Sequence, residues 1–376
     1  MKLASAATTL ALFAAPIVVL GDPCFLGDPC SSSWQNGADY IGGGGLYKES
    51  QGALVGDVFY MISSEGEVDT YEPEVNTWFA LSTLPTNTDA LQVVALNDSV
   101  HVIYVDKADP TNNELKHIVM TPGENPYTWN DATVFEHGGS SNFGFGGAVV
   151  TVGNKIYVFG RNLFSGIYSD AIHVYDGSFT TLDTNMVAER AWHTATLVGT
   201  KVYIIGGATS CVDVISMEVF DTETSVSSVD EIDQNNIPFA KISYHMTVTI
   251  EDMIYVIGGL QVSQYRQALP SCEAGAAISD KVWRYNPAED EWSEMPSLPL
   301  PRRQSAAFTY GREIFVVGGM GLGGWGTSST FRLDIGPPPS ESSTQVMNST
   351  KMTNGAYRPL TLWTMTHPLL SVRQIV

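Results

Sequence analysis

The sequence predicts an all-β fold, a six-bladed β-propeller made of four-stranded antiparallel blades. A strand-turn-strand pattern recurs along the 376 residues, its best copies end in Gly-Gly, and an aromatic residue marks each copy. A period of this length, with alternating apolar strands and glycine-rich turns, is typical of propellers. The aromatic markers are Tyr60, Tyr104, Tyr157, Tyr203, Tyr255 and Phe315, at intervals of 44, 53, 46, 52 and 60 residues.

The first half of each repeat is a predicted β-hairpin. In the copy that runs from Ala195 to Gly207, the turn Gly199-Thr200 joins two strands rich in apolar and β-branched residues. The second strand, 202–205, is apolar on both faces, which predicts that it lies between two neighbouring blades. The glycine pair that follows lets the backbone bend where a side chain would obstruct it.

The second half of each repeat carries an aromatic residue followed by an acid or an amide, as in Tyr175-Asp176, Phe220-Asp221 and Tyr285-Asn286. In two repeats a tryptophan follows, Trp78 and Trp292, and Trp129 has a similar place in the second repeat. These segments predict the third and fourth strands of the blades, with the tryptophans as packing residues.

An aromatic strand ending in Gly-Gly, then Tyr-Asp or Tyr-Asn, then Trp, resembles the Kelch repeat, and the resemblance extends from about Trp34 to Ile335. The copies at Tyr60 and Tyr104 depart from it because they lack the double glycine. The resemblance implies a propeller that presents its loops on two rims. It also implies that Arg and His at the start of an inner strand commonly bind carbonyl groups of the neighbouring turn.

The last repeat lacks a fourth strand, because Gly336 and three prolines follow Asp334. Trp34 precedes Tyr47 by the same 13 residues that separate Trp78 from Leu91. We therefore expect the N-terminal segment 34–41 to complete the last blade and close the ring, which protects its edges. The tail around Trp363 is the competing candidate for this strand.

The two ends of the chain differ from the repeats. Residues 1–21 combine Lys2, an apolar run and a small residue at Gly21, which predicts a secretory signal peptide, with an uncleaved anchor as the alternative. Residues 22–336 are assigned to the propeller. Residues 337–376, rich in Pro, Ser and Thr at their start, are interpreted as a disordered tail. The mature protein is therefore expected to be secreted, extracellular and without a membrane span.

The cysteines and glycosylation sequons agree with an oxidising compartment. Two disulfide bonds are plausible, Cys24 with Cys30 and Cys211 with Cys272. Asn97 and Asn348 are followed by the residues that permit N-glycosylation, and Asn97 falls in a predicted hairpin turn.

The formal charge of −21, from 40 acidic and 19 basic residues, disfavours nucleic acid as a partner because phosphates would be repelled. Cationic partners remain compatible with it. The acidic run 221–233 lacks the residue order of a calcium loop, and the spacing of the cysteines does not suit zinc. No metal or cofactor is expected.

Polar residues recur where the chain begins the innermost strand of a blade. Aligning the repeats brings together two arginines and, three residues later, two histidines. The predicted ligand-binding residues are Arg190, His193, His245, Arg302, Arg303 and Gln304. Because guanidinium groups suit carboxylates and other anions, this set predicts an anion pocket. Structural roles in the propeller are the alternative.

The predicted function is binding of an extracellular protein or a glycan through a propeller rim. Motifs of a hydrolase nucleophile, a zinc protease or a phosphate-binding loop are absent from the sequence, so no catalytic residue is assigned. One alternative is a carbohydrate-active enzyme, because copper-radical oxidases and bacterial sialic acid epimerases share this type of fold. The other is a purely structural matrix component. The partner's identity and the oligomeric state cannot be predicted.

Overall fold

The structure is a computed structural model of the chain. It describes residues 33–40, 50–63, 66–85, 88–106, 114–123, 128–130, 133–137, 146–163, 167–209, 216–239, 241–262, 276–323 and 326–336. All of them belong to one unit of the chain, Met1–Pro337. The predicted signal segment 1–21 and the predicted tail 337–376 lie outside the described residues, so both assignments stay predictions.

The described residues form strands, turns and bends without a helix, and they contain six four-stranded antiparallel sheets. We call each of these sheets a blade. Blade 1 consists of β2 (Ser50–Val55), β3 (Val58–Ser63), β4 (Glu67–Glu72) and β5 (Thr77–Thr83); blade 2 of β6 (Thr88–Leu96), β7 (Ser99–Asp106), β8 (Glu114–Met120) and β9 (Thr133–His137); and blade 3 of β10 (Ala148–Val152), β11 (Lys155–Leu163), β12 (Ile167–Tyr175) and β13 (Phe179–Asn185).

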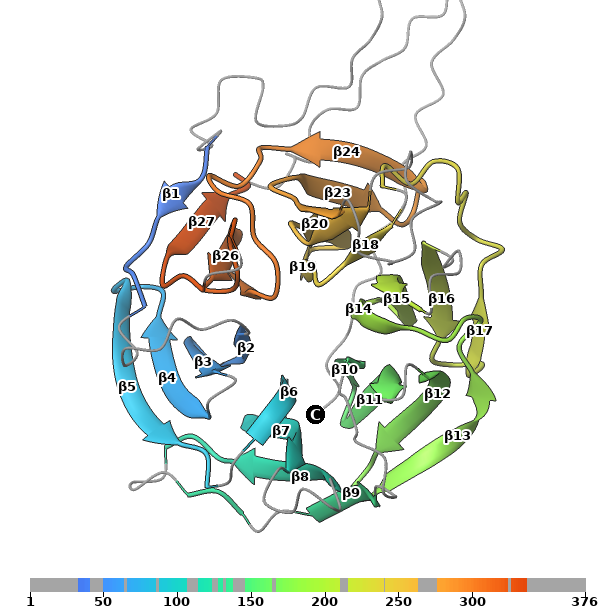
Figure 1. Ribbon diagram of the computed structural model, residues 1–376, viewed down its shortest axis with the longest axis horizontal. Coiled ribbons are helices and arrows are strands. Elements are labelled where there is room, and N and C mark those ends of the chain that lie inside the picture. The colour runs from blue at the N-terminus through green and yellow to red at the C-terminus, as the bar shows by residue number, and fades with distance from the viewer. Residues whose placement is uncertain are drawn as a thin grey trace, which may run out of the picture. The chain divides into compact units, whose positions relative to one another are not determined.

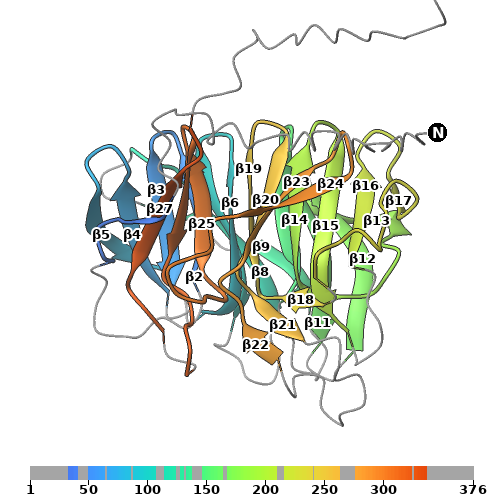
Figure 2. The same ribbon diagram turned by 90° about the horizontal axis from the view of Figure 1, so that it is seen from above.

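The other three blades follow in chain order. Blade 4 consists of β14 (Ala191–Val198), β15 (Lys201–Ala208), β16 (Met217–Asp221) and β17 (Val226–Ser228); blade 5 of β19 (Met246–Ile250), β20 (Met253–Ile257), β23 (Val282–Asn286) and β24 (Glu291–Met295); and blade 6 of β25 (Ala306–Tyr310), β26 (Glu313–Val317), β27 (Thr330–Asp334) and β1 (Gln35–Asn36). A three-stranded sheet of β18 (Ile242–Ser243), β21 (Leu260–Val262) and β22 (Ala276–Ile278) lies beside blade 5, at the lower edge of the ring in Figure 2.

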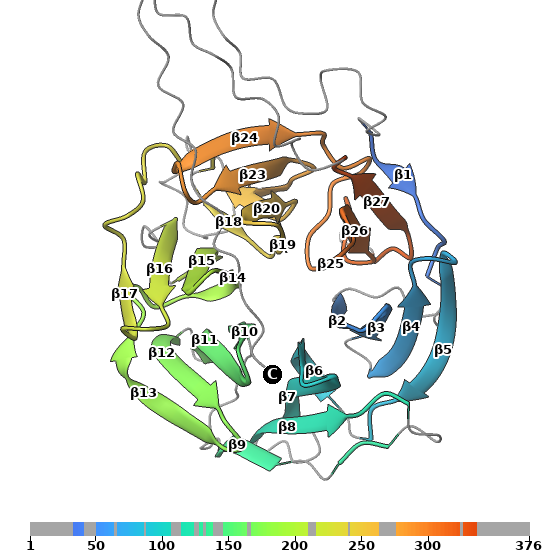
Figure 3. The ribbon, with the colours of Figure 1, turned by 180° about the vertical axis from the view of Figure 1, so that it is seen from behind.

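The blades are arranged around a common axis, with their first strands innermost (Figures 1 and 3). Each inner strand contacts the inner strand of the next blade, and β25 of blade 6 contacts β2 of blade 1, so the order is cyclic. The all-β, antiparallel propeller that the sequence predicts is therefore confirmed.

The hydrophobic core is divided among the spaces between neighbouring blades. Among the described residues, six clusters of buried side chains join blades 1 to 2, 2 to 3, 3 to 4, 4 to 5, 5 to 6 and 6 to 1. β15 shows why the second strand of a blade is apolar on both faces. Val202 and Ile204 pack toward blade 3, whereas Tyr203 and Ile205 pack toward blade 5, because successive side chains of a strand point to opposite faces.

The N-terminal segment closes the ring, as the sequence predicts. In β1, Gln35 is paired with Arg332 and Asn36 with Phe331 of β27. Backbone hydrogen bonds continue beyond β1, from the nitrogen of Gly37 to the oxygen of Thr330 at 2.8 Å.

Side chains reinforce this closure on both sides of blade 6. The indole nitrogen of Trp34 donates to the oxygen of Pro296 at 2.8 Å, toward blade 5. On the other side, the Trp78 indole of blade 1 donates to the oxygen of Ala38 at 3.1 Å, and the Tyr40 hydroxyl donates to Asp69. One short segment therefore ties blades 5, 6 and 1 together.

Candidate functional site

The ring has two rims made by different turns. The rim at which the inner strands begin also carries the glycine pairs 206–207, 258–259 and 318–319, and we call it the diglycine rim. The opposite rim carries the turns between the first and second strands, such as Gly199-Thr200, and we call it the hairpin rim. All of the predicted ligand-binding residues lie at the diglycine rim, in blades 4, 5 and 6.

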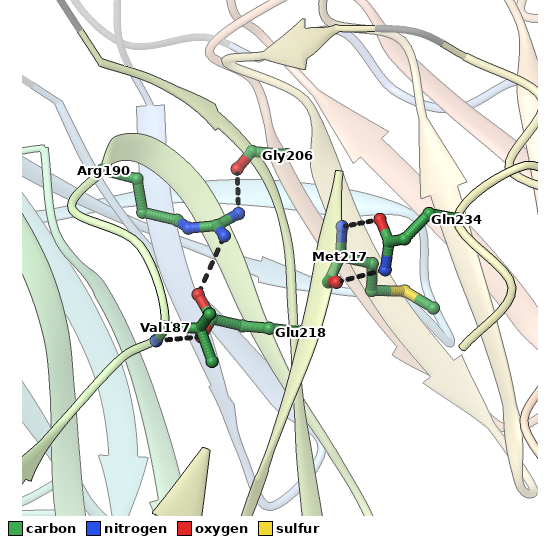
Figure 4. Close-up of polar contacts among 6 residues, drawn as sticks. All are labelled: Val187, Arg190, Gly206, Met217, Glu218 and Gln234. Carbon is green, nitrogen blue, oxygen red and sulfur yellow. Dashed lines mark hydrogen bonds and ion pairs between the residues drawn. The ribbon is translucent and has the colours of Figure 1, made fainter. Parts of the chain in front are cut away.

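Arg190 is fully buried at this rim and is held by blade 4 (Figure 4). Its Nη1 donates to the oxygen of Gly206 at 2.7 Å, and its Nη2 lies 2.8 Å from Oε1 of Glu218, whose side chain is also fully buried. The other carboxylate oxygen of Glu218 accepts a hydrogen bond from the nitrogen of Val187 at 2.5 Å. Burial raises the pKa of Glu218, although the Arg190 charge and the bonds from Val187 and Ala188 act against that shift.

Arg302 has the same place in blade 6 but different partners. Glu218 is paired with Ile204, two residues before Gly206, and Phe331 is paired with Val316, two residues before Gly318. The Arg302 guanidinium therefore meets the ring of Phe331, with its carbon 5.3 Å from the ring centroid, instead of a carboxylate. Its Nη2 donates to the hydroxyl of Ser329 at 2.6 Å.

The two histidines lie where two adjacent inner strands begin, His193 within β14 and His245 immediately before β19, and they flank the glycine pair 206–207. A Cβ on Gly206 would come within 2.8 Å of the His245 ring, and one on Gly207 within 2.9 Å of the His193 Cβ, so only glycine fits here. The Thr194 hydroxyl lies 2.9 Å from Nε2 of His245 and joins blade 4 to blade 5.

Both histidines are held in the neutral form. Burial lowers the pKa of His245 to about 3, and burial, followed by the charge of Arg190, lowers the pKa of His193 well below its ordinary value. The ligand-binding assignment of these residues stays a prediction, and their contacts show what each of them does for the fold.

Acid should destabilise the protein through His245. Because its folded pKa lies below its unfolded value, its contribution is complete above about pH 6.5 and decreases as the pH falls toward the folded value. We expect His245→Gln to lower the free energy of unfolding at neutral pH. Between about pH 7.5 and about pH 5, the free energy of unfolding should then decrease less in the variant than in the wild type. Urea titrations across this range measure the difference. Parallel profiles for the two proteins would contradict this role of His245.

A series of backbone hydrogen bonds runs along the diglycine rim from blade to blade. The nitrogen of Trp192 donates to the oxygen of Gly146 at 2.6 Å, that of Tyr244 to the oxygen of Trp192 at 3.0 Å, and that of Gln304 to the oxygen of Tyr244 at 2.9 Å. Trp192, Tyr244 and Gln304 have φ angles of 57°, 55° and 55°. This left-handed conformation is unfavourable for residues with large side chains, so the rim stores strain at three equivalent positions.

These backbone positions place a row of side chains across four blades. Tyr168 of β12 meets Trp192 edge-on with 5.9 Å between the ring centroids, and Trp192 stacks on Tyr244 at 5.2 Å. The Arg303 guanidinium lies over the opposite end of the row, 5.5 Å from the centroid of Tyr244. All four side chains are partly exposed. We call Tyr168, Trp192, Tyr244 and Arg303 the aromatic row.

Sequence reasoning identified Arg303 and Gln304 but missed Trp192, Tyr244 and Tyr168. The alignment of the repeats used the first residue of each inner segment and the one three positions later, whereas Trp192, Tyr244 and Gln304 lie two positions after the start. Glu218 was also missed, because nothing in the sequence pairs this strand residue with Arg190.

Several other predictions concern residues that the structure describes only in part or not at all. The cysteines Cys24, Cys30, Cys211 and Cys272, and Asn348, are outside the described residues. Asn97 is exposed in the turn between β6 and β7, with a φ of 49°, so a glycan at this position would reach solvent. Its glycosylation stays a prediction. Within the described ranges, no three His, Cys, Asp or Glu side chains converge on a point that would hold a metal ion, and no helix is long and apolar enough to cross a bilayer.

Comparison with known proteins agrees with this architecture. Residues 105–319, more than half of the chain, match the KLHDC2/KLHL20/DRC7 Kelch-repeats domain. Beta-scruin of Limulus polyphemus is 28% identical over 160 residues, which are 41% of this chain and 16% of that protein. Kelch-like protein 15 of Danio rerio is 27% identical over 203 residues, 50% of this chain and 32% of that protein.

A solved structure shows the same fold. The structure of YjhT superposes with a TM-score of 0.63, covering 78% of this chain and 96% of that chain, at 13% sequence identity. At this identity the likeness describes the fold alone. The matched segments are less than a third of scruin and about a third of the Kelch-like protein, so the activities of those whole proteins are not transferred to this chain.

Proposed function

Because the chain belongs to the KLHDC2/KLHL20/DRC7 Kelch-repeats family, we propose that it is an extracellular binding module whose diglycine rim recognises a partner protein. The observation that carries this proposal is the partly exposed Tyr, Trp and Arg side chains at that rim, which are the residue types that dominate binding energy in protein interfaces.

Exposed apolar residues in other loops of the diglycine rim support the same proposal. Leu322, Leu300 and Val187 lie in loops of the diglycine rim and are 69%, 52% and 45% exposed. Exposed apolar side chains on a rim are typical of surfaces that bind a protein, because a partner removes them from water. The extracellular location is supported by the signal-like residues 1–21 and by the sequons at Asn97 and Asn348.

The location is tested by expressing the full chain with its own N-terminus in a eukaryotic secretory host. We expect the protein in the medium, with an N-terminus that follows Gly21. Retention in the cytosol with residues 1–21 still attached would contradict an extracellular role.

The binding surface is tested with two variants of similar exposure. Leu322→Arg alters the diglycine rim, and Val75→Arg alters a turn at the hairpin rim, where Val75 is 59% exposed. The secreted protein serves as bait in extracellular fluid, with chemical crosslinking and mass spectrometry to identify the protein that it captures. We expect Leu322→Arg to abolish capture and Val75→Arg to retain it. The proposal would be wrong if both variants captured the partner equally, or if only glycans bound on a parallel glycan array.

A further inference from the structure

We propose that Asn36 is a modification site: its side-chain amide is lost by deamidation when β1 leaves blade 6, and the isoaspartate that forms prevents β1 from closing the ring again. The chain has two Asn-Gly pairs, Asn36-Gly37 and Asn354-Gly355, and the second lies outside the described residues. Asn36 is exposed in β1, at the outer edge of blade 6 (Figure 1). The site therefore lies in the segment on which closure of the propeller depends.

The reaction needs only water and a free backbone nitrogen. The nitrogen of Gly37 attacks Cγ of Asn36, the Cγ–Nδ2 bond breaks, and the amide group leaves as ammonia with the proton of the Gly37 nitrogen. Water then opens the resulting five-membered imide at either carbonyl carbon and yields aspartate or isoaspartate, without oxidation or reduction. Asparagine is among the thermolabile residues, and a following glycine favours the attack because it has no Cβ to obstruct the approach.

Packing explains why glycine occupies position 37. A Cβ on Gly37 would come within 2.9 Å of Cγ2 of Thr330. Thr330 is fully buried in blade 6, so it has little room to move away. The fold thus requires the reactive glycine beside Asn36, whereas the backbone pairing of Asn36 with Phe331 would accept other residues.

Pairing of β1 protects Asn36 while the ring is closed. The Gly37 nitrogen donates to the oxygen of Thr330 at 2.8 Å, and a nitrogen held in a backbone hydrogen bond is not free to attack. β1 consists of two residues at the edge of its sheet, so its release should cost less free energy than global unfolding. Deamidation of Asn36 should therefore take place only while blade 6 is open.

Isoaspartate lengthens the backbone between two fixed points, because the main chain then runs through the former side chain. On one side, the indole nitrogen of Trp34 donates to the oxygen of Pro296 at 2.8 Å. On the other side, the nitrogen of Tyr40 donates to the oxygen of Ser328 at 2.7 Å. An added methylene group shifts the register between these points, so the contacts on one side must break. The edge of β27 then stays unpaired and open to pairing with another chain.

The first test compares the full-length protein with the peptide 33–40 at mildly alkaline pH. Peptide mapping by mass spectrometry separates the product at Asn36 from any product at Asn354. We expect deamidation of Asn36 to be about 10- to 100-fold slower in the protein than in the peptide, because most molecules are closed at any moment. The variant Gln35→Cys with Arg332→Cys, oxidised to link β1 to β27, should react at least about tenfold more slowly than its reduced form.

The second test separates the lengthened backbone from the new charge. Protein aged in urea below its unfolding midpoint is deamidated in part, and anion exchange purifies the fraction with the added carboxylate. Calorimetry of this fraction should show a transition about 5 °C or more below that of fresh protein, in proportion to its isoaspartate content. Asn36→Asp has the carboxylate and an ordinary backbone, so its melting temperature should lie within about 1 °C of the wild type.

Asn36→Gln is the matched control for the modification itself. It keeps an exposed amide, but its longer side chain would have to form a six-membered ring, so position 36 should stay unmodified and the melting curve should equal that of the wild type. Three results would overturn the inference: no product at Asn36 of the protein once the peptide has reacted completely, equal rates in the oxidised and reduced cysteine variants, or an isoaspartate fraction that melts like fresh protein.

Discussion

Deletion of residues 22–45 should lower the melting temperature of the protein by roughly 10 °C or more. The deletion removes β1 and with it the fourth strand of blade 6, so the edge of β27 loses its partner. It also removes Trp34 and Tyr40, which pack between blades 5, 6 and 1 and shield apolar surface from water. Burial of two aromatic side chains contributes about 5 kcal/mol, from which the expected shift in melting temperature follows.

The measurement is differential scanning calorimetry of the deleted and intact proteins at the same pH. Tyr40→Phe is the milder companion, because it keeps the ring of Tyr40 and removes only the hydrogen bond to Asp69. It should cost about 1 kcal/mol or slightly more, since the buried carboxyl loses a donor. An unchanged melting curve for the deletion would mean that another segment closes blade 6.

Glu218→Ala should destabilise the protein by about 3–5 kcal/mol, because it leaves the Arg190 charge buried without its partner. Both side chains of the pair are fully buried, and the change also removes the acceptor of the Val187 backbone nitrogen. The loss should appear as a lower midpoint in urea denaturation. Within the described residues, Lys281 and Glu294 form a comparison pair whose side chains are 45% and 48% exposed. Glu294→Ala should therefore change the stability by less than about 1 kcal/mol.

The double variant Arg190→Met with Glu218→Leu separates the charge from the packing. Because it removes both buried charges, it should be more stable than Glu218→Ala alone. Equal effects of Glu218→Ala and Glu294→Ala would show that the buried pair has no special role, and Arg190 would then be available for the ligand-binding role that its sequence position suggests.

The fold could be predicted because each of its determinants is repeated in the sequence. Strands that lie between two blades must be apolar on both faces, so Val202 to Ile205 identifies the second strand of a blade without knowledge of its neighbours. The closure of blade 6 could be predicted from the spacing of Trp34. The position of Trp34 relative to its strand, however, differs from that of Trp78. Trp78 lies within β5, whereas Trp34 precedes β1 and reaches across to Pro296. Trp129 likewise lies outside β9 and forms an isolated bridge with Met120.

The candidate site was less predictable, because it depends on which strands become neighbours. Arg190 and Arg302 have the same place in their repeats, yet one meets Glu218 and the other meets Phe331, and this difference lies in a strand many residues away. The left-handed backbone at Trp192 and Tyr244 has no signature in the residue types, since neither favours that conformation. The row that these residues form is produced by hydrogen bonds between blades, which a repeat alignment does not contain.

The most direct test of ring closure is a disulfide bond engineered between β1 and β27. Gln35 and Arg332 are directly paired, so Gln35→Cys with Arg332→Cys places the two thiols opposite each other on neighbouring strands. Under mild oxidation we expect a crosslinked peptide that contains both new cysteines, identified by mass spectrometry, and none from the control with Asp334→Cys in place of Arg332→Cys. Free thiols at positions 35 and 332, or equal crosslinking in the control, would contradict closure of the propeller by its N-terminal strand.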